Sequence, residues 1–403
     1  MCYKTYKIAD LIEEIAMGPF GSNIKVECFV DEGVPVLNGS NLEGFALSER
    51  EFRYVTPEKA ASLKKANASR GDVVITHRGT LGQIVYIPET SKFEQYVISQ
   101  SQFRVRCNEK ILPEYMVYYF HTAIGQHKLL SNASQVGVPA LARPSSTFQQ
   151  IEIDVPSIDV QRKIVAVLNT IQSKINCNSK INDNLYRLLM LSFKHDYWDV
   201  AGCQTTWTPT TLGEATSRFG TGLNPRKNFV LGHGSNYYVT IKNMRNNRIY
   251  LDEHCDMVDD DALIKIQKRS DLQVGDLLFS GIGTIGRVYL IDKPATNWNT
   301  SESVFNLRPN ASVSSEFLYL LLLHNDMQEY AVNLASGSVQ KGIRMADLKR
   351  YRFILPNIDD MQRLTALWSP LIRQIKSNEQ ESDRLAEIRD TLLPQLMAGK
   401  FEF

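Results

Sequence analysis

The stretch Gln161-Arg162-Lys163-Ile164-Val165-Ala166-Val167-Leu168 opens the part of the sequence that decides the fold. It follows Val155-Pro156-Ser157, and apolar residues then recur at steps of three and four at Ile164, Leu168, Ile171 and Ile175. This spacing places them on one stripe of a helix, which we predict from Ser157 to about Lys194. About 35 residues would form a rod of roughly 50 Å, longer than an ordinary core helix.

The C-terminal part of the sequence repeats this pattern. After Leu355-Pro356-Asn357 the apolar stripe continues through Leu364, Trp368, Leu371, Ile375, Leu385, Ile388 and Leu392. Pro156 corresponds to Pro356, and Ile175 to Ile375, at a shift of about 200 residues. We therefore interpret the chain as a duplication, in which each copy is a globular block followed by a long helix.

The globular blocks share a strand, a glycine turn and a second strand. Gly79-Thr80-Leu81-Gly82 and Gly283-Thr284-Ile285-Gly286 each lie between two short apolar runs that are typical of strands. The two blocks differ most at residues 18–55 and 216–260. A retained frame with divergent loops suggests that both copies perform the same task on different targets.

These features predict an α+β fold in which two globular mixed α/β domains are separated by two long antiparallel helices, with an internal pseudo-twofold repeat. We expect the domains at residues 1–156 and 201–356, and the helices at residues 157–200 and 357–403. Asn178, Asn182, Asn378 and Ser382 interrupt the apolar stripes at matching places. Polar residues there would fix the register of the helix pair, and contact with solvent or a partner is the alternative.

Composition limits the cellular setting. With 403 residues, 43% of them hydrophobic, the chain can bury at least two cores. We see no signal-peptide pattern and no apolar run of the roughly 18 residues that a membrane span requires, so we expect no membrane association. Six cysteines without a Cys-x-x-Cys pair favour a reduced, cytoplasmic protein without a zinc site. A net charge of +1 neither supports nor excludes nucleic acid as a partner.

Catalytic motifs are weak. Gly281-Ile282-Gly283-Thr284-Ile285-Gly286 matches the dinucleotide fingerprint, but that fingerprint needs a helix to begin in the loop, and Arg287-Val288-Tyr289 looks like a strand. A structural hairpin turn is the better interpretation. The histidines form no metal-binding pair, and Asp347-Leu348-Lys349 is better read as a solvated helix start than as a nuclease motif. We therefore expect no catalytic or metal site.

The best candidates for contact with nucleic acid are loops that combine cations with amides. Arginine can bind guanine, and asparagine can bind adenine, through two hydrogen bonds each. The predicted DNA-binding residues are Asn38, Ser40, Asn41, Arg78, Gln135, Arg143, Lys242, Asn243, Arg245, Asn247, Arg248, Gln340, Lys341 and Arg344. For any single residue a solvated loop is an equally good interpretation, whereas for the set we favour contact.

Several segments together resemble the DNA-specificity subunit of type I restriction–modification systems. They are the two Gly-Asp strands with their glycine turns (71–82 and 275–286), the start of the first long helix, and the tail Glu387-Ile388-Arg389-Asp390-Thr391-Leu392-Leu393-Pro394 to Gly399. The segments Ala140-Leu141-Ala142-Arg143 and Gly342-Ile343-Arg344-Met345 match the family's pattern only loosely. Because target-reading residues vary freely in this family, no base contact is implied by motif.

The resemblance implies two target-recognition domains, each reading one half of a split site in double-stranded DNA. The paired helices would act as a ruler, up to about 15 base pairs long, and as docking sites for two methylation subunits. Those partners would hold S-adenosylmethionine and flip the target adenine, and restriction subunits using ATP and Mg²⁺ would join for cleavage. This chain would then carry no cofactor. A coiled-coil scaffold, or the recognition part of a fused methyltransferase–nuclease, remains an alternative.

Overall fold

The computed structural model describes residues 3–19, 21–134, 137–336 and 341–401. The chain forms two compact units: residues 1–176 with 382–403 make unit 1, and residues 177–381 make unit 2. Two long helices, α5 (Ile158–Phe193) and α11 (Ile358–Met397), contribute residues to both units. Both predicted long helices are therefore confirmed, and the repeat consists of a mixed α/β domain followed by a long helix.

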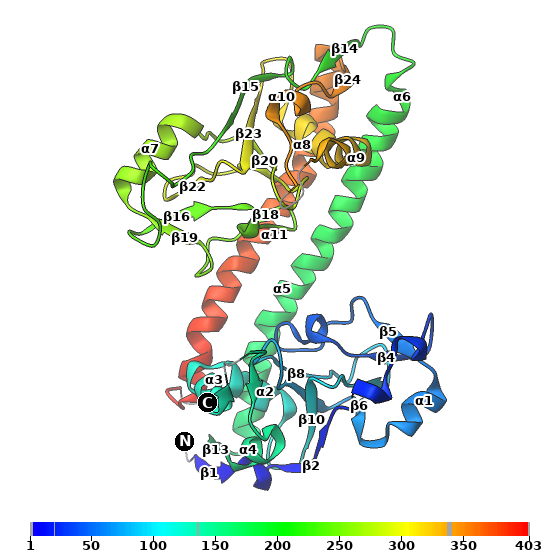
Figure 1. Ribbon diagram of the computed structural model, residues 1–403, viewed down its shortest axis with the longest axis vertical. Helices are drawn as coiled ribbons and strands as arrows, with labels where there is room; N and C mark the ends of the chain where they lie inside the picture. Colours follow the sequence, from blue (N-terminus) through cyan, green and yellow to red (C-terminus); the bar gives the residue numbers. More distant parts are fainter. Residues whose placement is uncertain (1–2, 20, 135–136, 337–340, 402–403) are drawn as a thin grey trace. The chain divides into compact units, whose positions relative to one another are not determined.

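Unit 1 is built on two sheets (Figure 1). The four-stranded antiparallel sheet has the order β2-β10-β7-β8, formed by β2 (Ile12–Met17), β10 (Gln102–Cys107), β7 (Asp72–Thr76) and β8 (Ile84–Tyr86). The second sheet has the order β3-β5-β4-β9-β6, formed by β3 (Phe29–Val30), β5 (Arg53–Val55), β4 (Val34–Val36), β9 (Gln95–Val97) and β6 (Asn67–Ser69). Within it, β4 and β9 run parallel.

Helices α2 (Pro113–His121) and α4 (Pro144–Gln150) pack on the four-stranded sheet of unit 1, whereas α1 (Pro57–Ser62) packs on the second sheet. The remaining elements are β1 (Lys4–Lys7) paired with β13 (Glu152–Val155), the short pair β11 (Ala133–Ser134) and β12 (Ala140–Leu141), and α3 (Ala123–Leu130). Helix α2 is buried almost throughout, and its core includes Ile164 and Leu168 of α5 with Leu393 and Leu396 of α11. The start of α5 and the end of α11 are therefore part of this domain's core.

Unit 2 repeats the plan. Its four-stranded antiparallel sheet has the order β15-β23-β20-β21, formed by β15 (Thr216–Thr221), β23 (Val304–Pro309), β20 (Leu277–Ser280) and β21 (Val288–Leu290). Its second sheet, β19-β16-β22, comprises β19 (Asp256–Val258), β16 (Asn236–Val239) and β22 (Trp298–Thr300), with β16 parallel to β22. Among the described residues each unit has one pair of parallel strands, β4 with β9 and β16 with β22, so the repeat includes this pair.

The other elements of unit 2 follow the order of unit 1. They are a π-helical turn (Lys194–Trp198), α6 (Asp199–Ala201), β14 (Thr208–Thr211) paired with β24 (Arg352–Leu355), the hairpin β17 (Met244–Arg245) and β18 (Arg248–Ile249), α7 (Asp260–Ser270), α8 (Ser315–Leu323), α9 (Asn325–Leu334) and α10 (Met345–Leu348). The hairpin lies in the region where the sequences of the two copies diverge most, and α7 follows that region directly. In Figure 1, α8 and α9 lie beside the two long helices.

The Gly-Asp motif marks a buried ion pair in each unit. Asp72 is fully buried and accepts hydrogen bonds from Arg106 at 2.9 and 3.2 Å and from the Ser69 amide at 2.9 Å. In the other copy Asp276 accepts from Arg308 at 2.7 and 2.9 Å and from the Gln273 amide at 3.0 Å. Each pair ties the turn before one central strand to the neighbouring strand with two-pronged geometry.

The long helices pack against each other in antiparallel directions. In unit 1, Arg389 donates to Gln172 at 2.7 Å, and in unit 2, Trp368 donates to Ser192 at 2.9 Å. Unit 2 also contains a polar layer, in which Asn378 donates to Asn182 at 2.8 Å and Asn182 donates to the Ile375 carbonyl at 3.2 Å. The asparagines expected to interrupt the stripe therefore pair across the helices, where they penalise a shifted register.

The structure distinguishes the two interpretations of the glycine turn in unit 2. The GxGxxG segment leads directly from β20 into the antiparallel β21, so no helix begins there. The hairpin interpretation is confirmed, and the dinucleotide geometry is not present.

Removal of the buried carboxylate should test the anchoring role of the ion pair. Asp72→Ala leaves the Arg106 and Arg104 guanidiniums without their shared partner, so we expect a loss of roughly 3 kcal/mol of unfolding free energy. Urea denaturation followed by circular dichroism measures it. Glu27→Ala, which removes an exposed ion pair with Lys25, is the control and should leave the midpoint unchanged. Equal effects of the two substitutions would contradict this assignment.

Candidate nucleic-acid interface

Three segments of unit 1 meet at one place. They are the 3-10 turn η4 (Gly39–Leu42), the glycine turn at residues 78–82, and residues 137–140 leading into β12. The Gln83 amide donates to the Gly39 carbonyl at 3.0 Å, and the Gly79 amide donates to the Pro139 carbonyl at 2.9 Å. These bonds join loops distant in sequence into one surface, which we call reading surface 1.

The equivalent segments of unit 2 form reading surface 2. They are the 3-10 turn η7 (Ile241–Asn243) with the β17–β18 hairpin, the glycine turn at residues 282–286, and the loop ending at residues 341–344. The Arg287 guanidinium donates to the Ile241 and Met244 carbonyls, both at 2.5 Å. The Gly283 amide donates to the Lys341 carbonyl at 2.7 Å. The same connections thus recur in the second copy.

The second glycine of each turn is required by its surroundings. Gly82 has φ +87° and Gly286 has φ +92°, a region that side chains other than glycine adopt at a cost. A β-carbon would meet the Gln126 side chain at 2.4 Å in unit 1 and that of Gln328 at 2.1 Å in unit 2. These glutamines, on α3 and α9, each donate at 2.9 Å to the carbonyl of the glycine that they face.

Gln126 and Gln328 were missed by sequence reasoning, although they lie at equivalent positions in the repeat. Each also donates to the last turn of the preceding helix, Gln126 to the Phe120 carbonyl at 2.7 Å and Gln328 to the Leu322 carbonyl at 2.6 Å. The glycine turns are therefore fixed to the helical layer. The shared shift of 202 residues between the two glutamines was the available signal.

Most of the predicted cations lie exposed on the reading surfaces. The exposed predicted residues are Asn38, Ser40, Arg78 and Arg143 in unit 1, and Lys242, Arg245, Lys341 and Arg344 in unit 2. Arg78 forms a backbone bridge with Ala140, which brings the glycine turn close to the segment carrying Arg143. Gln135 and Gln340 lie outside the described residues. Contact of these residues with DNA stays a prediction.

The structure corrects the role predicted for Asn41 and Asn243. Asn41 is 0% exposed, accepts from the Asn38 amide at 3.0 Å, and donates to the Ser48 and Arg50 carbonyls at 3.0 and 2.7 Å. Asn243 is 3% exposed and accepts from the Thr240 amide at 2.9 Å. Their amides are used to close the loops, so they cannot present hydrogen bonds to base edges, and we assign them to loop stability.

Arg248 is also placed differently from the expectation. It is half-buried, with Nε 4.0 Å from a Glu379 carboxylate oxygen on α11 and the guanidinium 5.3 Å from the Tyr250 ring centre. Arg245 lies across the hairpin, 4.5 Å from the same ring centre and 3.6 Å from Asp252, and stays half exposed. Asn247 occupies the tight turn with φ +56° and is half-buried. Arg245 is therefore better presented to a ligand than Arg248.

The electrostatics of reading surface 1 rest on arginine and not on histidine. His77 precedes Arg78, and its Nε2 lies 3.1 Å from the Gln100 carbonyl oxygen. Burial lowers the pKa of the His77 imidazole below its ordinary value, with the neighbouring Arg78 charge as a minor contribution. The imidazole is therefore neutral at neutral pH and adds no charge to the surface.

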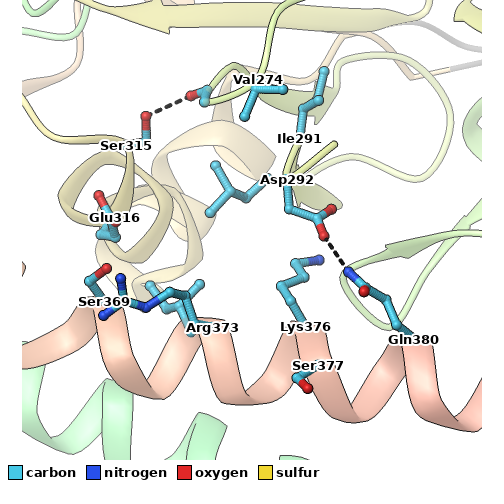
Figure 2. Close-up of a pocket in the computed structure, with 13 residues that line it drawn as sticks. Val274, Ile291, Asp292, Ser315, Glu316, Ser369, Arg373, Lys376, Ser377 and Gln380 are labelled. Carbon is cyan, nitrogen blue, oxygen red and sulfur yellow. Dashed lines mark hydrogen bonds between the residues drawn. The ribbon is translucent and has the colours of Figure 1, made fainter. Parts of the chain in front are cut away.

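A pocket of about 510 Å³ lies beside α11 in unit 2 (Figure 2). Two hydrogen bonds join groups in its lining: Gln380 donates to Asp292 at 3.1 Å, and Ser315 donates to the Gly275 carbonyl at 2.7 Å. Lys376 pairs with Glu379 at 3.2 Å, and burial raises the pKa of the Glu379 carboxyl against the opposing effect of Lys376. This arrangement stabilises the helix–domain junction.

Among residues 3–19, 21–134, 137–336 and 341–401, no group of three His, Cys, Asp or Glu side chains is arranged to hold a metal ion. In that same part of the chain, none of the helices has both the length and the apolar character needed to cross a membrane.

Known proteins resemble the chain over nearly its whole length. The family model described as the type I restriction modification DNA specificity domain matches twice, at residues 3–187 and 206–387. The MjaIX specificity subunit of Methanocaldococcus jannaschii is 21% identical over 417 residues, which cover 98% of this chain and 92% of that protein. The HindI specificity subunit of Haemophilus influenzae is 29% identical over 135 residues, covering 33% of this chain and 29% of that protein.

A solved structure shares the fold. The S subunit of a type I restriction–modification system from M. genitalium superposes with a TM-score of 0.55 at 16% identity, covering 98% of this chain and 96% of that one. The chain is therefore a duplicated α/β protein with exposed cations on the loops of each copy, and clustered cations are the electrostatic feature by which nucleic-acid-binding proteins are recognised. Because the family model covers both copies, the chain belongs to the type I restriction modification DNA specificity domain family.

The buried asparagine of reading surface 1 provides a test of its assigned role. Asn41→Ala removes three hydrogen bonds from a buried loop, so we expect a loss of about 1–3 kcal/mol of unfolding free energy. Urea denaturation measures this loss. Ser40→Ala, at an exposed neighbouring position, serves as the control and should be near neutral. If Asn41→Ala were as stable as the control, the assignment to loop stability would fail.

Proposed function

We propose that this chain is the sequence-reading subunit of a type I restriction–modification complex, in which each reading surface recognises one half of a bipartite DNA site. One observation carries the proposal. In both copies the same described segments are joined by equivalent hydrogen bonds: a side chain donates to a carbonyl of the 3-10 turn, and a glycine amide donates to a carbonyl of the third segment. The exposed side chains on these segments differ. Equivalent frames with different side chains are what two readers of different base sequences require.

The chemistry of reading surface 2 supports contact in a DNA groove. The β17–β18 hairpin is a two-stranded ribbon, and a ribbon of this width fits the major groove. Arg245 lies exposed on this hairpin, and Lys242 lies exposed on η7, which precedes it. The ion pair of Arg245 with Asp252 spans 3.6 Å at an exposed site, so its loss costs little when the guanidinium turns to a phosphate or a guanine.

The long helices carry matched apolar residues that suit a protein partner bound twice. Val167 and Ile388 are exposed by 37% and 44% in unit 1, and the equivalent Leu367 and Leu188 by 46% and 50% in unit 2. Exposed apolar residues at the same repeat positions indicate one kind of contact made by each unit. We assign these positions to two methylation subunits, one for each unit.

A groove beside the start of each helix supports the same assignment. In unit 1 it is lined by Gly71, Leu112, Ile158 and Arg162 among others, with a volume of about 430 Å³. In unit 2, Ser314, Ile358 and Gln362 line a groove of about 610 Å³ at the corresponding positions. Its continuation contains Gly275, the counterpart of Gly71. A partner that recognises the helix start would therefore meet similar surroundings in both units.

We assign the reaction chemistry to the partners. S-adenosylmethionine would be held by the methylation subunits, and ATP and Mg²⁺ by restriction subunits, so that this chain contributes recognition without a cofactor of its own. The match to a family described by DNA specificity supports this division of labour. Purified chain alone should neither methylate nor cleave a plasmid that carries its site.

The reading role of unit 2 can be tested in cells. Lys242→Ala with Arg245→Ala removes two exposed cations, each able to contribute about 1–3 kcal/mol of discrimination if it binds a base. We expect modification of the bipartite motif to be lost or relaxed at one half-site only, as measured by methylome sequencing. Lys268→Ala on α7, an exposed cation away from the three loops, is the control. An unchanged motif with unchanged occupancy would refute the assignment.

The docking role predicts a change in stoichiometry. In unit 2, Leu188→Asp with Leu367→Asp places charge on both exposed apolar positions, so we expect binding of one methylation subunit where the unaltered chain binds two. Native mass spectrometry of the purified complex measures the ratio. Ser179→Asp, at an exposed polar position on α5, should keep both partners. Retention of two partners by the double variant would disprove the docking site.

A further inference from the structure

One residue in each copy connects the glycine turn to the 3-10 turn, which is η4 in unit 1 and η7 in unit 2. Gln83 and Arg287 occupy the same repeat position, directly after the second glycine of the turn. The Gln83 side chain donates to the Gly39 carbonyl at 3.0 Å, and that of Arg287 donates to the Ile241 and Met244 carbonyls at 2.5 Å. A neutral and a charged side chain thus make the same connection.

The base of each bridge is fixed by the sheet. The Thr76 amide donates to the Gln83 carbonyl at 2.9 Å, and the Thr76 hydroxyl donates to the Gln83 side-chain oxygen at 3.2 Å. In unit 2 the Ser280 amide donates to the Arg287 carbonyl at 2.9 Å, and the Arg287 amide donates to the Ser280 hydroxyl at 2.8 Å. The 3-10 turn in each copy is therefore connected, through Gln83 or Arg287, to the end of a central strand, β7 or β20.

The contacts of Arg287 favour a positioning role over direct contact with DNA. The guanidinium is half-buried, and one of its terminal nitrogens is committed to two carbonyls. The first copy has glutamine at this place, so a positive charge is not common to the two copies. What both copies retain is a donor directed at the main chain of the 3-10 turn.

We propose that Gln83 and Arg287 are positioning residues for DNA recognition. Each fixes the position and orientation of a 3-10 turn relative to the glycine turn, and so of the loop that reads one half-site. The inference rests on the proposed function and adds to it the residues on which discrimination depends. Base-edge hydrogen bonds lose their selectivity when donors move by about an ångström, so a loosened loop should bind DNA with less sequence preference.

The test uses the chain assembled with its methylation subunits and short duplexes. One duplex carries the site found by methylome sequencing, and two others carry a base substitution in one half-site or the other. Fluorescence anisotropy gives Kd for each, and discrimination is the ratio of substituted to cognate Kd. The variants are Gln83→Ala, Arg287→Ala, Arg287→Gln and, as a charge-matched control, Lys268→Ala.

Each alanine variant should lose discrimination at a different half-site. A good base contact is worth roughly five- to a hundredfold in discrimination, and we expect Arg287→Ala to lose about tenfold at one half-site, with less than a twofold change at the other. Gln83→Ala should show the reverse pattern with a smaller loss, because it removes one neutral bond. Lys268→Ala should change neither ratio.

Two readouts separate positioning from other roles. Removal of a phosphate-binding residue weakens binding to all duplexes alike and reduces the slope of log K against log salt concentration by about one. Removal of a positioning residue should leave this slope unchanged. Arg287→Gln keeps one donor, as the first copy does, and should restore most of the discrimination. A variant that merely folds less well would lower the binding-competent fraction without changing the ratio.

The inference is overturned if discrimination is unchanged in both alanine variants, if both half-sites lose it equally, or if Arg287→Ala weakens all duplexes alike with a reduced salt dependence. Failure of the proposed function gives a different result. In that case the unaltered complex itself would not distinguish cognate from substituted duplexes.

Discussion

The buried carboxylate of the Gly-Asp motif is the constraint on which the rest of each domain depends. Asp72 and Asp276 each hold a paired arginine on the neighbouring strand, so the two central strands and the turn before them cannot shift independently. A carboxylate without its partner would be costly in that setting, which explains why the pair is present in both copies although most surrounding residues differ. The glycine turns that follow β7 and β20 are therefore held in a fixed position by these strands.

The loops of the reading surfaces are connected to this ion pair's sheet by side chains that donate hydrogen bonds to main-chain carbonyls. Gln126 and Gln328 join the glycine turns to the helical layer, and Gln83 and Arg287 join the turns to the 3-10 loops. In unit 1, Arg389 of α11 also stacks over Phe45, 4.8 Å from the ring centre, in the segment that follows η4. Each loop is thus positioned by the strand end and, through its flank, by the long helix.

Sequence reasoning predicted what depends on local pattern. The periodicity of Ile164, Leu168 and Ile175 was sufficient to predict α5, and the strand-like run after Gly286 was sufficient to reject a cofactor turn. It could not separate Asn41, which is buried, from Ser40, which is exposed, because both lie in a polar loop and only the fold decides which side chain turns inward. The half-buried placement of Arg248 could not be predicted for the same reason, since its contact with Glu379 comes from a residue distant in sequence.

The bonding pattern also explains how such a domain can change its target without losing its fold. The bonds that Gln83, Arg287, Gln126 and Gln328 donate to the reading surfaces all end on carbonyls, which any residue at that place supplies, so the exposed side chains there are free to vary. Asn41 and Asn243 close their loops in the same way, each accepting from a main-chain amide. Substitution at Lys242 or Arg245 therefore alters the exposed side chains of reading surface 2 while these bonds remain. Main-chain atoms accept the bonds that stabilise the loops, whereas exposed side chains differ between the copies. This separation allows two copies of one domain to read different sequences.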